Sequence, residues 1–301
     1  MIRLIYLVVL LTVASAALAD KTLTGFYDGT TGRALTAGDL ASRLSAADVI
    51  LLGEIHTDAG AHRKQIDVIR QIAVFRPEAN RVLSLEEFNR DQQDILDSWV
   101  AGELSAEQLK AERRFVNLTV KKNWLDWNLP KLEAGRDSGY RLLAANAPLK
   151  YSRLARNHGC NDLPELTEPE LALFDCPQAP LDAEYAERFS ATLKRVSARG
   201  EGTGLKPIED EQAQQLFVAH RVWDATMAQS IVDARAAGAD VVVHIVGNFH
   251  IDFDGGLLDE LRARDPDAEL LTITFMRRRK PANHRLAAPD AGRADIVVYT
   301  R

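Results

Sequence analysis

Side chains capable of metal binding or acid–base chemistry follow four separate apolar segments of this 301-residue chain. The first pair is Glu54 and His56, which come directly after the apolar run 49–52. The others, in chain order, are Glu86 with Glu87, then Asn146, then Asn248 with His250. Carboxylates and imidazoles can together hold a divalent metal ion, and they can equally transfer protons. Taken singly, each group is explained as well by a helix cap, a solvated acid or a turn.

The run 49–52 has the composition of a buried parallel strand, because it is apolar on both faces. We predict strands at 49–52, 82–88, 141–145, 241–246, 270–275 and 294–300. Helical patterns lie between them, at 59–75, 91–100, 105–114, 124–136, 209–237 and 257–264. This alternation predicts an α/β fold with a mostly parallel sheet flanked by helices. The carboxyl ends of parallel strands share one edge, so we expect the polar groups to meet in one crevice there.

Three further histidines lie close to these segments in the sequence. His62 lies in the first turns of the helix after His56, where it either faces back into the crevice or lies on the surface. His244 is inside a predicted strand and is expected to be a hydrogen-bonded core residue. His220 is one helical turn from Asp224, and a packed His–Asp pair is its simplest interpretation.

The first 19 residues have the pattern of an export signal. The apolar run 4–13 follows a short charged start, and Ala17-Leu18-Ala19 is a small-x-small cleavage site before Asp20. This run is shorter than the ~20 residues that a membrane-spanning helix needs. We therefore predict a periplasmic or secreted protein with a mature domain of residues 20–301. No cysteine stands at the cleavage site, so a lipoprotein is not expected.

Residues 150–204 interrupt the α/β pattern with several prolines and glycines and a helical stretch at 182–199. We predict an inserted α-helical subdomain or lid in this region. It contains both cysteines of the chain, Cys160 and Cys176. A disulfide between them is the first expectation in an exported protein, and a free pair or a metal role is the alternative.

Charge and motif content disfavour several classes of function. The formal net charge is −6, which disfavours a nucleic-acid partner. No Gly-x-Ser-x-Gly sequence is present, which disfavours a serine hydrolase of the nucleophile-elbow type. No Gly-x-Gly-x-x-Gly sequence follows a predicted strand, which disfavours a dinucleotide site.

Six motifs, in their order and spacing, resemble the ChaN-like haem-binding uptake proteins over about residues 47–275. They are Leu51-Leu52-Gly53-Glu54-Ile55-His56 with His62 and Gln65, Leu85-Glu86-Glu87-Phe88-Asn89-Arg90-Asp91-Gln92-Gln93, Trp124-Leu125-Asp126-Trp127, Asn146-Ala147-Pro148, Trp223-Asp224-Ala225-Thr226-Met227-Ala228 and Gly247-Asn248-Phe249-His250. The resemblance extends to a wider superfamily that includes TraB proteins, Tiki-type metalloproteases and erythromycin esterases.

The resemblance implies an exported α/β protein that binds haem in haem or iron uptake. It also implies a homodimer and contact with outer-membrane uptake machinery. His62, Asn146 and Asn248 are implied as cofactor-binding residues. The haem axial ligand is not identified by the motifs. Side chains of suitable type in regions without a strong pattern are Tyr27, Tyr151, His158 and Tyr185.

The same resemblance implies an alternative function, a metal-dependent hydrolase. Glu54, His56, Glu86 and His250 would then be the catalytic residues, and they would bind a divalent metal ion or activate water directly. A metal ion can lower the pKa of its bound water to about 7, which makes hydroxide available at neutral pH.

Overall fold

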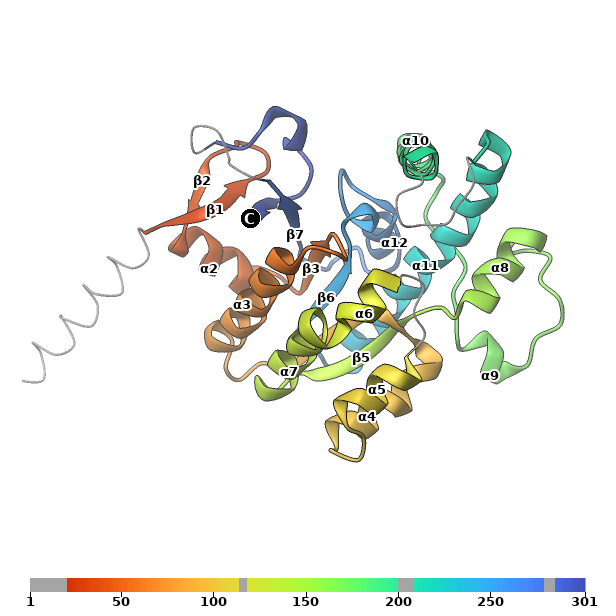
Figure 1. The fold of residues 1–301 in the computed structure, drawn as a ribbon, viewed down its shortest axis with the longest axis horizontal. Helices are drawn as coiled ribbons and strands as arrows, with labels where there is room; N and C mark the ends of the chain where they lie inside the picture. The colour runs from red at the N-terminus through yellow and green to blue at the C-terminus, as the bar shows by residue number, and fades with distance from the viewer. Residues whose placement is uncertain (1–20, 114–117, 200–207, 279–284, 301) are drawn as a thin grey trace, which may run out of the picture.

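The computed structural model describes residues 21–113, 118–199, 208–278 and 285–300. The predicted export signal therefore lies outside the described residues. Within these ranges the chain forms an eight-stranded sheet flanked by helices (Figure 1). No helix among the described residues has the length and apolar character needed to cross a membrane.

The sheet is mostly parallel, as predicted. Its strands are β1 (Thr22–Asp28), β2 (Ala34–Thr36), β3 (Val49–Glu54), β4 (Arg81–Asn89), β5 (Arg141–Asn146), β6 (Val241–Gly247), β7 (Leu270–Arg277) and β8 (Ile296–Thr300). Their order across the sheet is β2-β1-β8-β7-β3-β6-β4-β5. All pairs from β8 to β5 are parallel. At one edge, β1 pairs in the antiparallel sense with both β2 and β8.

Helices cover both faces of the sheet. The described helices are α2 (Ala37–Ala46), α3 (Ala59–Phe75), α4 (Gln93–Val100), α5 (Ala106–Glu112), α6 (Leu118–Trp127), α7 (Leu129–Asp137), α8 (Leu149–His158), α9 (Glu168–Leu171), α10 (Ala183–Arg199), α11 (Asp210–Ala236) and α12 (Gly256–Arg264). Short 3-10 turns are η1 (Arg90–Gln92), η2 (Asn248–His250) and η4 (Ala288–Asp290).

Strand β3 shows why helices pack on both faces of the sheet. Its side chains alternate between the two faces. Ile50 and Leu52 join the core under α2 to α7, whereas Val49 and Leu51 join the core under α11 and α12. Every residue of β3 is buried, because β6 and β7 pair with its two edges and helices cover its faces. The strand therefore holds Glu54, its last residue, in a fixed position.

The predicted single helix at 124–136 is wrong, because the structure has two helices there. Helix α6 ends at Trp127, Asn128 follows, and α7 begins at Leu129 with Pro130 in its first turn. Proline has no N–H to donate, so Pro130 cannot continue the hydrogen bonds of α6, whereas a proline is tolerated in the first turn of a new helix. This break places Lys131 in the first turn of a separate helix.

The region predicted as an insertion contains most of α8 and all of α9 and α10. The predicted disulfide is present, and it joins Cys160 to Cys176 with an S–S distance of 2.10 Å. Tyr151 and Phe174 stack 5.0 Å apart beside it, in a small core that also includes Val222 of α11. Helices α8 and α10 both pack against α11 (Figure 1).

Candidate functional site at the carboxyl edge of the sheet

The carboxyl ends of β3, β4 and β6 bring the predicted residues to one edge. Glu54 of β3 is level with Gly247 of β6 in the strand register. Strand β4 lies on the other side of β6 and carries Glu86 just beyond its paired residues. His250 follows in the 3-10 turn after β6. The expected convergence of strand ends is therefore what the fold produces.

Four side chains form what we call the Glu54 cluster: Glu54, His56, His62 and Lys131. Lys131 Nζ lies 2.6 Å from Glu54 Oε2. His62 Nδ1 is 3.3 Å from the same oxygen, and His56 Nδ1 is 3.2 Å from Oε1. Glu54, His62 and Lys131 are buried, whereas the His56 side chain is 50% exposed. The Glu54 carboxylate thus has partners on both oxygens.

Five side chains form a second group, which we call the His250 cluster: Glu86, Tyr185, His220, Asp224 and His250. His250 Nδ1 lies 2.6 Å from Asp224 Oδ1, and its Nε2 lies 3.4 Å from Glu86 Oε1. The Tyr185 hydroxyl is 3.0 Å from Asp224 Oδ2 and 2.7 Å from His220 Nε2. The His220 and His250 rings are stacked with 4.1 Å between centroids.

Gly247 separates the two clusters and leaves space between them. A Cβ atom at this position would lie 3.0 Å from His56 Nε2 and 3.5 Å from Glu86 Oε2. The Gly247 N–H also donates to Glu86 Oε2. A side chain at this position would crowd His56, so glycine favours the close approach of His56 and Glu86 to the β6 backbone. Imidazole and carboxylate face the same small space above it.

Each cluster holds buried charges of both signs. Burial would raise the pKa of Glu54, but Lys131, His62 and His56 outweigh it and hold that pKa well below its usual value. Burial likewise opposes ionisation of Glu86, but its hydrogen bond and charge interaction with His250 lower the pKa. Burial disfavours the charged form of His250, yet Asp224 and Glu86 raise its pKa to about 10. At neutral pH His250 is therefore cationic between acidic neighbours.

Other residues named from the sequence have structural partners. Asn146 donates from Nδ2 to the Glu86 carbonyl at 3.1 Å, and so lies beside the site. Asn248 Nδ2 instead lies 3.3 Å from Met276 Sδ. Glu87 accepts from Trp124 Nε1 at 2.8 Å and pairs with Arg113. His244 Nδ1 is 2.9 Å from Ser84 Oγ in the core, as predicted.

Sequence reasoning missed Lys131, named Tyr185 only as a possible haem ligand, and assigned no site role to Asp224. Lys131 is only 1% exposed, although lysine is almost never fully buried without a partner. Its signal in the sequence is its position between Leu129-Pro130 and Leu132. Asp224 lies in a resemblance motif, and its role as the Nδ1 partner of His250 follows only from the three-dimensional contact.

The predicted metal ligands Glu54, His56, Glu86 and His250 are divided between the clusters. Among the described residues, the donor atoms that all lie within 4.8 Å of one another belong to His220, Asp224 and His250. These atoms already bond one another or Tyr185, and a 2.6 Å N–O separation is a hydrogen-bond length. Lys131 also places a cation against Glu54, which opposes a second cation there. In this arrangement neither donor set fits a divalent ion.

The fold and the site together define an α/β protein with paired carboxylate and imidazole clusters at the carboxyl edge of its sheet. Residues 40–261 match the model of the family described as "Haem-binding uptake, Tiki superfamily, ChaN". This match spans most of the chain, and the protein belongs to that family.

Solved structures and one curated protein are similar to this chain. The structure described as "Cofacial heme binding to ChaN of Campylobacter jejuni" has a TM-score of 0.63 at 16% identity, covering 92% of this chain and 96% of that one. An erythromycin esterase mutant in its open conformation has a TM-score of 0.46 at 14% identity, covering 91% of this chain and 82% of that one. The first of these supports the fold.

The curated relative is Protein RETICULATA-RELATED 5, chloroplastic, of Arabidopsis thaliana. It is 26% identical over 218 residues, which are 70% of this chain and 28% of that protein. The chain therefore spans less than a third of the length of this relative.

Proposed function

We propose that this protein binds haem and acts in haem or iron uptake after export. The observation that carries the proposal is the family match over residues 40–261, which includes every member of both clusters. The similar chain of known structure is described as binding haem cofacially. That description supports haem as the ligand here. A homodimer is part of the proposal as the assembly.

A side chain must be accessible to serve as an axial ligand of haem iron. Haem iron takes His, Tyr, Met or Cys as axial ligands. Of the tyrosines named from the sequence, Tyr27, Tyr151 and Tyr185 are all buried. His158 is exposed, and His56 is half exposed with Nδ1 bonded to Glu54. A carboxylate on the second ring nitrogen orients an iron-binding imidazole, so His56 fits the role of ligand. His158 fits it by its exposure alone.

A haem titration tests the proposal. Addition of haem to the purified protein should shift the Soret band and saturate at a fixed ratio of haem to protein. His56→Ala and His158→Ala, measured in parallel, should identify the ligand by loss of the shift in one of them. No spectral change at micromolar haem would refute haem binding. A shift that survives in both variants would refute this choice of ligands.

Export and uptake are parts of the same proposal. The support for export is the pattern of residues 1–19, with cleavage near Ala19-Asp20. Fractionation of expressing cells should recover a mature form without lipid in the periplasm or the medium, and mass spectrometry should show Asp20 as its first residue. An intact leader on cytoplasmic protein would contradict export. Crosslinking of the exported form tests for a homodimer and for outer-membrane uptake partners.

A second candidate function is hydrolysis by acid–base chemistry at the edge of the sheet. The observation that favours it is that two imidazoles, His56 and His250, are each bonded through Nδ1 to a buried carboxylate. This arrangement fixes an imidazole for proton transfer through Nε2. Glu86 lies near both rings, since His250 Nε2 is 3.4 Å from it and the His56 charge interacts with it. Because the donors do not fit a divalent ion, we expect this activity without a metal.

Ester hydrolysis and metal content distinguish this candidate. The wild-type protein should hydrolyse p-nitrophenyl acetate, and Glu86→Gln and His250→Gln should each lose at least 10-fold in kcat/KM. Metal analysis and chelator treatment of the same sample test the role of a divalent ion. Wild-type hydrolysis no faster than that of the two variants would refute the enzyme function. Loss of activity with chelator, restored by a divalent ion, would instead support the metal-dependent form.

A further inference from the structure

Asp224 is the buried carboxylate bonded to His250 Nδ1, and its own contacts show how it acts on that ring. It lies on α11, which covers one face of the sheet, and its side chain is only 1% exposed. Burial raises its pKa, and the positive charge of His250 acts in the opposite direction. A buried acid is costly unless it is well bonded. Both oxygens of Asp224 are bonded, one to His250 and one to Tyr185.

The bonds of Asp224 determine how the His250 ring is oriented. Asp224 Oδ1 has no proton to give when ionised, so His250 Nδ1 must be the donor in the 2.6 Å contact. The opposite ring nitrogen, Nε2, then points to Glu86 at 3.4 Å. The stacked His220 ring, 4.1 Å away, restricts tilting of the His250 ring out of this plane.

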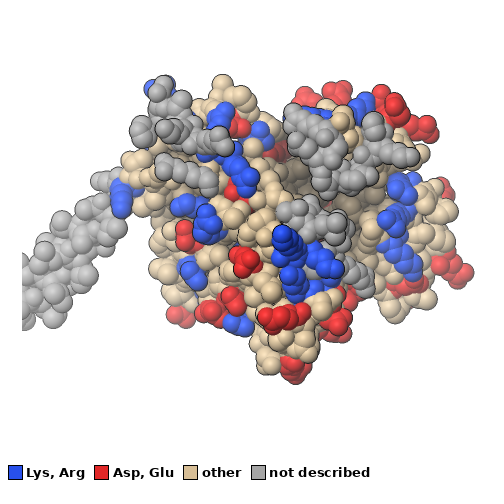
Figure 2. All heavy atoms as spheres, viewed as in Figure 1, with Lys and Arg blue, Asp and Glu red and all other residues tan. Residues whose placement is uncertain are grey.

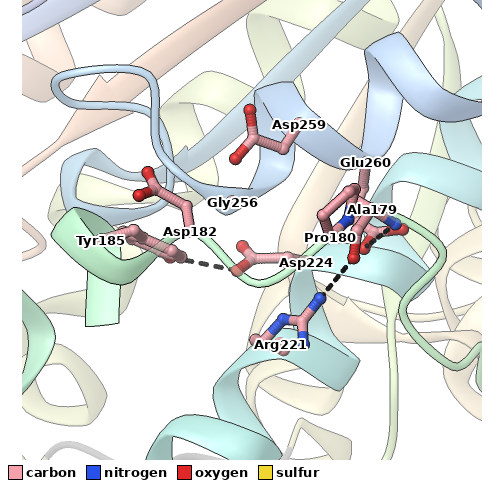
Figure 3. Close-up of a pocket in the computed structure, with 9 residues that line it drawn as sticks. All are labelled: Ala179, Pro180, Asp182, Tyr185, Arg221, Asp224, Gly256, Asp259 and Glu260. Atoms are coloured by element: carbon pink, nitrogen blue, oxygen red, sulfur yellow. Dashed lines mark hydrogen bonds between the residues drawn. The ribbon is translucent and has the colours of Figure 1, made fainter.

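A second set of contacts holds Asp224 itself. The Tyr185 hydroxyl donates to Asp224 Oδ2, which leaves its oxygen to accept from His220 Nε2 at 2.7 Å. Burial and the nearby His250 charge keep the pKa of His220 well below its usual value, so this imidazole is neutral. Figure 3 shows Tyr185 and Asp224 pointing toward each other across the narrow pocket.

The surroundings of this contact are closely packed. A Cβ at Gly256, the first residue of α12, would lie 2.5 Å from Asp224 Oδ2 and 2.5 Å from Tyr185 Cε1. The pocket beside them, which Arg221 and Glu260 also line, has a volume of about 10 Å³. That volume is at the lower limit of what one water molecule needs. Asp224 therefore has room for its protein partners and little else.

We propose that Asp224 is a positioning residue, which holds His250 with a proton on Nδ1 and with Nε2 directed at Glu86, and that Tyr185 and His220 hold Asp224 in turn. It does for His250 what Glu54 does for His56 on the other side of Gly247. The proposal rests on the second function above, since it explains how His250 performs acid–base work. The chemistry served is proton transfer to or from a group bound beside Glu86.

Nitrogen-15 NMR of histidine-labelled protein tests the proposal without any substrate. In the wild type, the His250 signal, identified by its absence in His250→Gln, should show a proton on Nδ1 in a strong hydrogen bond with a far-downfield shift. In Asp224→Asn that downfield proton should disappear. Asp233→Asn is the matched control, because Asp233 lies on the same helix, is exposed and bonds only to Gln229 among the contacts resolved for it. It should leave the His250 signal unchanged.

Three results would overturn the proposal. The first is a wild-type His250 with a bare Nδ1, a result that needs no variant and no assumption about folding. The second is a downfield proton that persists in folded Asp224→Asn. The third is a downfield proton that is identical in Tyr185→Phe and the wild type, because loss of a residue that holds Asp224 should at least shift or broaden this signal.

Activity separates this proposal from the function on which it rests. If p-nitrophenyl acetate is hydrolysed, Asp224→Asn should lower kcat by at least 10-fold with little change in KM, since Asp224 lies behind His250. An equal loss in Asp233→Asn would contradict the assignment. If the wild type does not hydrolyse the ester, the hydrolase function fails, while the NMR result still decides the role of Asp224.

Discussion

Lys131 is the residue on which the Glu54 cluster depends most directly. Its ammonium group lies 2.6 Å from Glu54 Oε2, and both side chains are nearly inaccessible to solvent. The attraction between two such charges offsets the cost of removing each of them from water. With Lys131 in place, Glu54 is ionised and holds His56 through Nδ1. A cation supplied by the chain thus performs the neutralising role that the sequence suggested for a metal ion.

Replacement of Lys131 by methionine should destabilise the fold strongly. The side chain keeps its apolar stem, but Glu54 loses the partner that compensates its buried charge. Breaking a buried pair in this way costs ~3–5 kcal/mol. The free energy of unfolding in urea measures the effect, and Lys122→Met is the control, because Lys122 is exposed on α6. Equal stability of the two variants would show that the pair contributes nothing.

The double variant Glu54→Gln with Lys131→Met tests the cause of that loss. Removal of both charges should recover part of the stability, because no uncompensated charge is then buried. If the losses in unfolding free energy of the two single variants simply add in the double variant, the effect of Lys131 comes from packing and not from its charge.

At the same scale, the strand-end residues could be predicted from sequence and their partners could not. Glu54, His56 and Glu86 directly follow apolar runs, and the parallel arrangement of those runs brings them to one edge. Lys131 and Asp224 come from helices far away in the sequence, and no local pattern links them to an acid or an imidazole. Only the packing of α7 and α11 onto the sheet creates those contacts.

Among the elements, the β1–β2 hairpin and α2 are joined by the Asp28 side chain. Asp28 ends β1 and accepts from the Thr31 N–H and hydroxyl at 2.6 and 2.7 Å. Arg43 of α2 pairs with its other oxygen. Burial opposes ionisation, but the bonds to Arg43 and Thr31 outweigh it and lower the Asp28 pKa to about 2. The antiparallel edge of the sheet is thereby attached to the parallel part.

This pKa predicts a loss of stability in acid. An aspartate has a pKa of about 3.9 in an unfolded chain, so Asp28 binds its proton more weakly in the folded protein. Its contribution of roughly 2 kcal/mol is present above pH 4 and is lost as the pH falls through about 2. Unfolding free energies of the wild type and Asp28→Asn should converge over that range. Asp67→Asn, at an exposed site, should parallel the wild type.

Element boundaries were predictable where caps or apolar patterns are strong. Helix α3 begins and ends at the predicted residues, because Asp58 accepts from the Gly60 N–H and caps its start. The break between α6 and α7 was missed, because the pattern of apolar residues continues across it while Pro130 alone signals the new helix. The proline therefore sets the boundary between α6 and α7, although the apolar periodicity continues across it.

At the scale of the whole molecule, the order of the strands in the sheet could not be predicted from the sequence. The alternation of strands and helices predicts a parallel sheet, but the central places of β3 and β6 depend on long-range pairing. Basic and acidic side chains both occur on the face seen in Figure 2, with basic residues gathered near its centre. The net charge of −6 therefore does not appear there as one uniformly acidic surface.

The layered arrangement predicts a gradient of local stability that hydrogen exchange can measure. Strands β3 and β6 are fully buried and paired on both edges, so their amides should exchange only when the whole domain unfolds. The segment 161–173, closed by the disulfide, is mostly exposed or partly exposed and contains only the four-residue helix α9. It should exchange by local opening, orders of magnitude faster.

Mass spectrometry of peptides from both regions over seconds to hours gives the comparison, with a fully deuterated sample as the reference. Helix α10 carries Tyr185 and lies outside the sheet layers, so its peptides should fall between the two extremes. Protection of 161–173 equal to that of β6 would contradict the gradient. If α10 instead exchanges as slowly as β6, the His250 cluster unfolds only with the sheet, and the outer helices belong to the same cooperative unit.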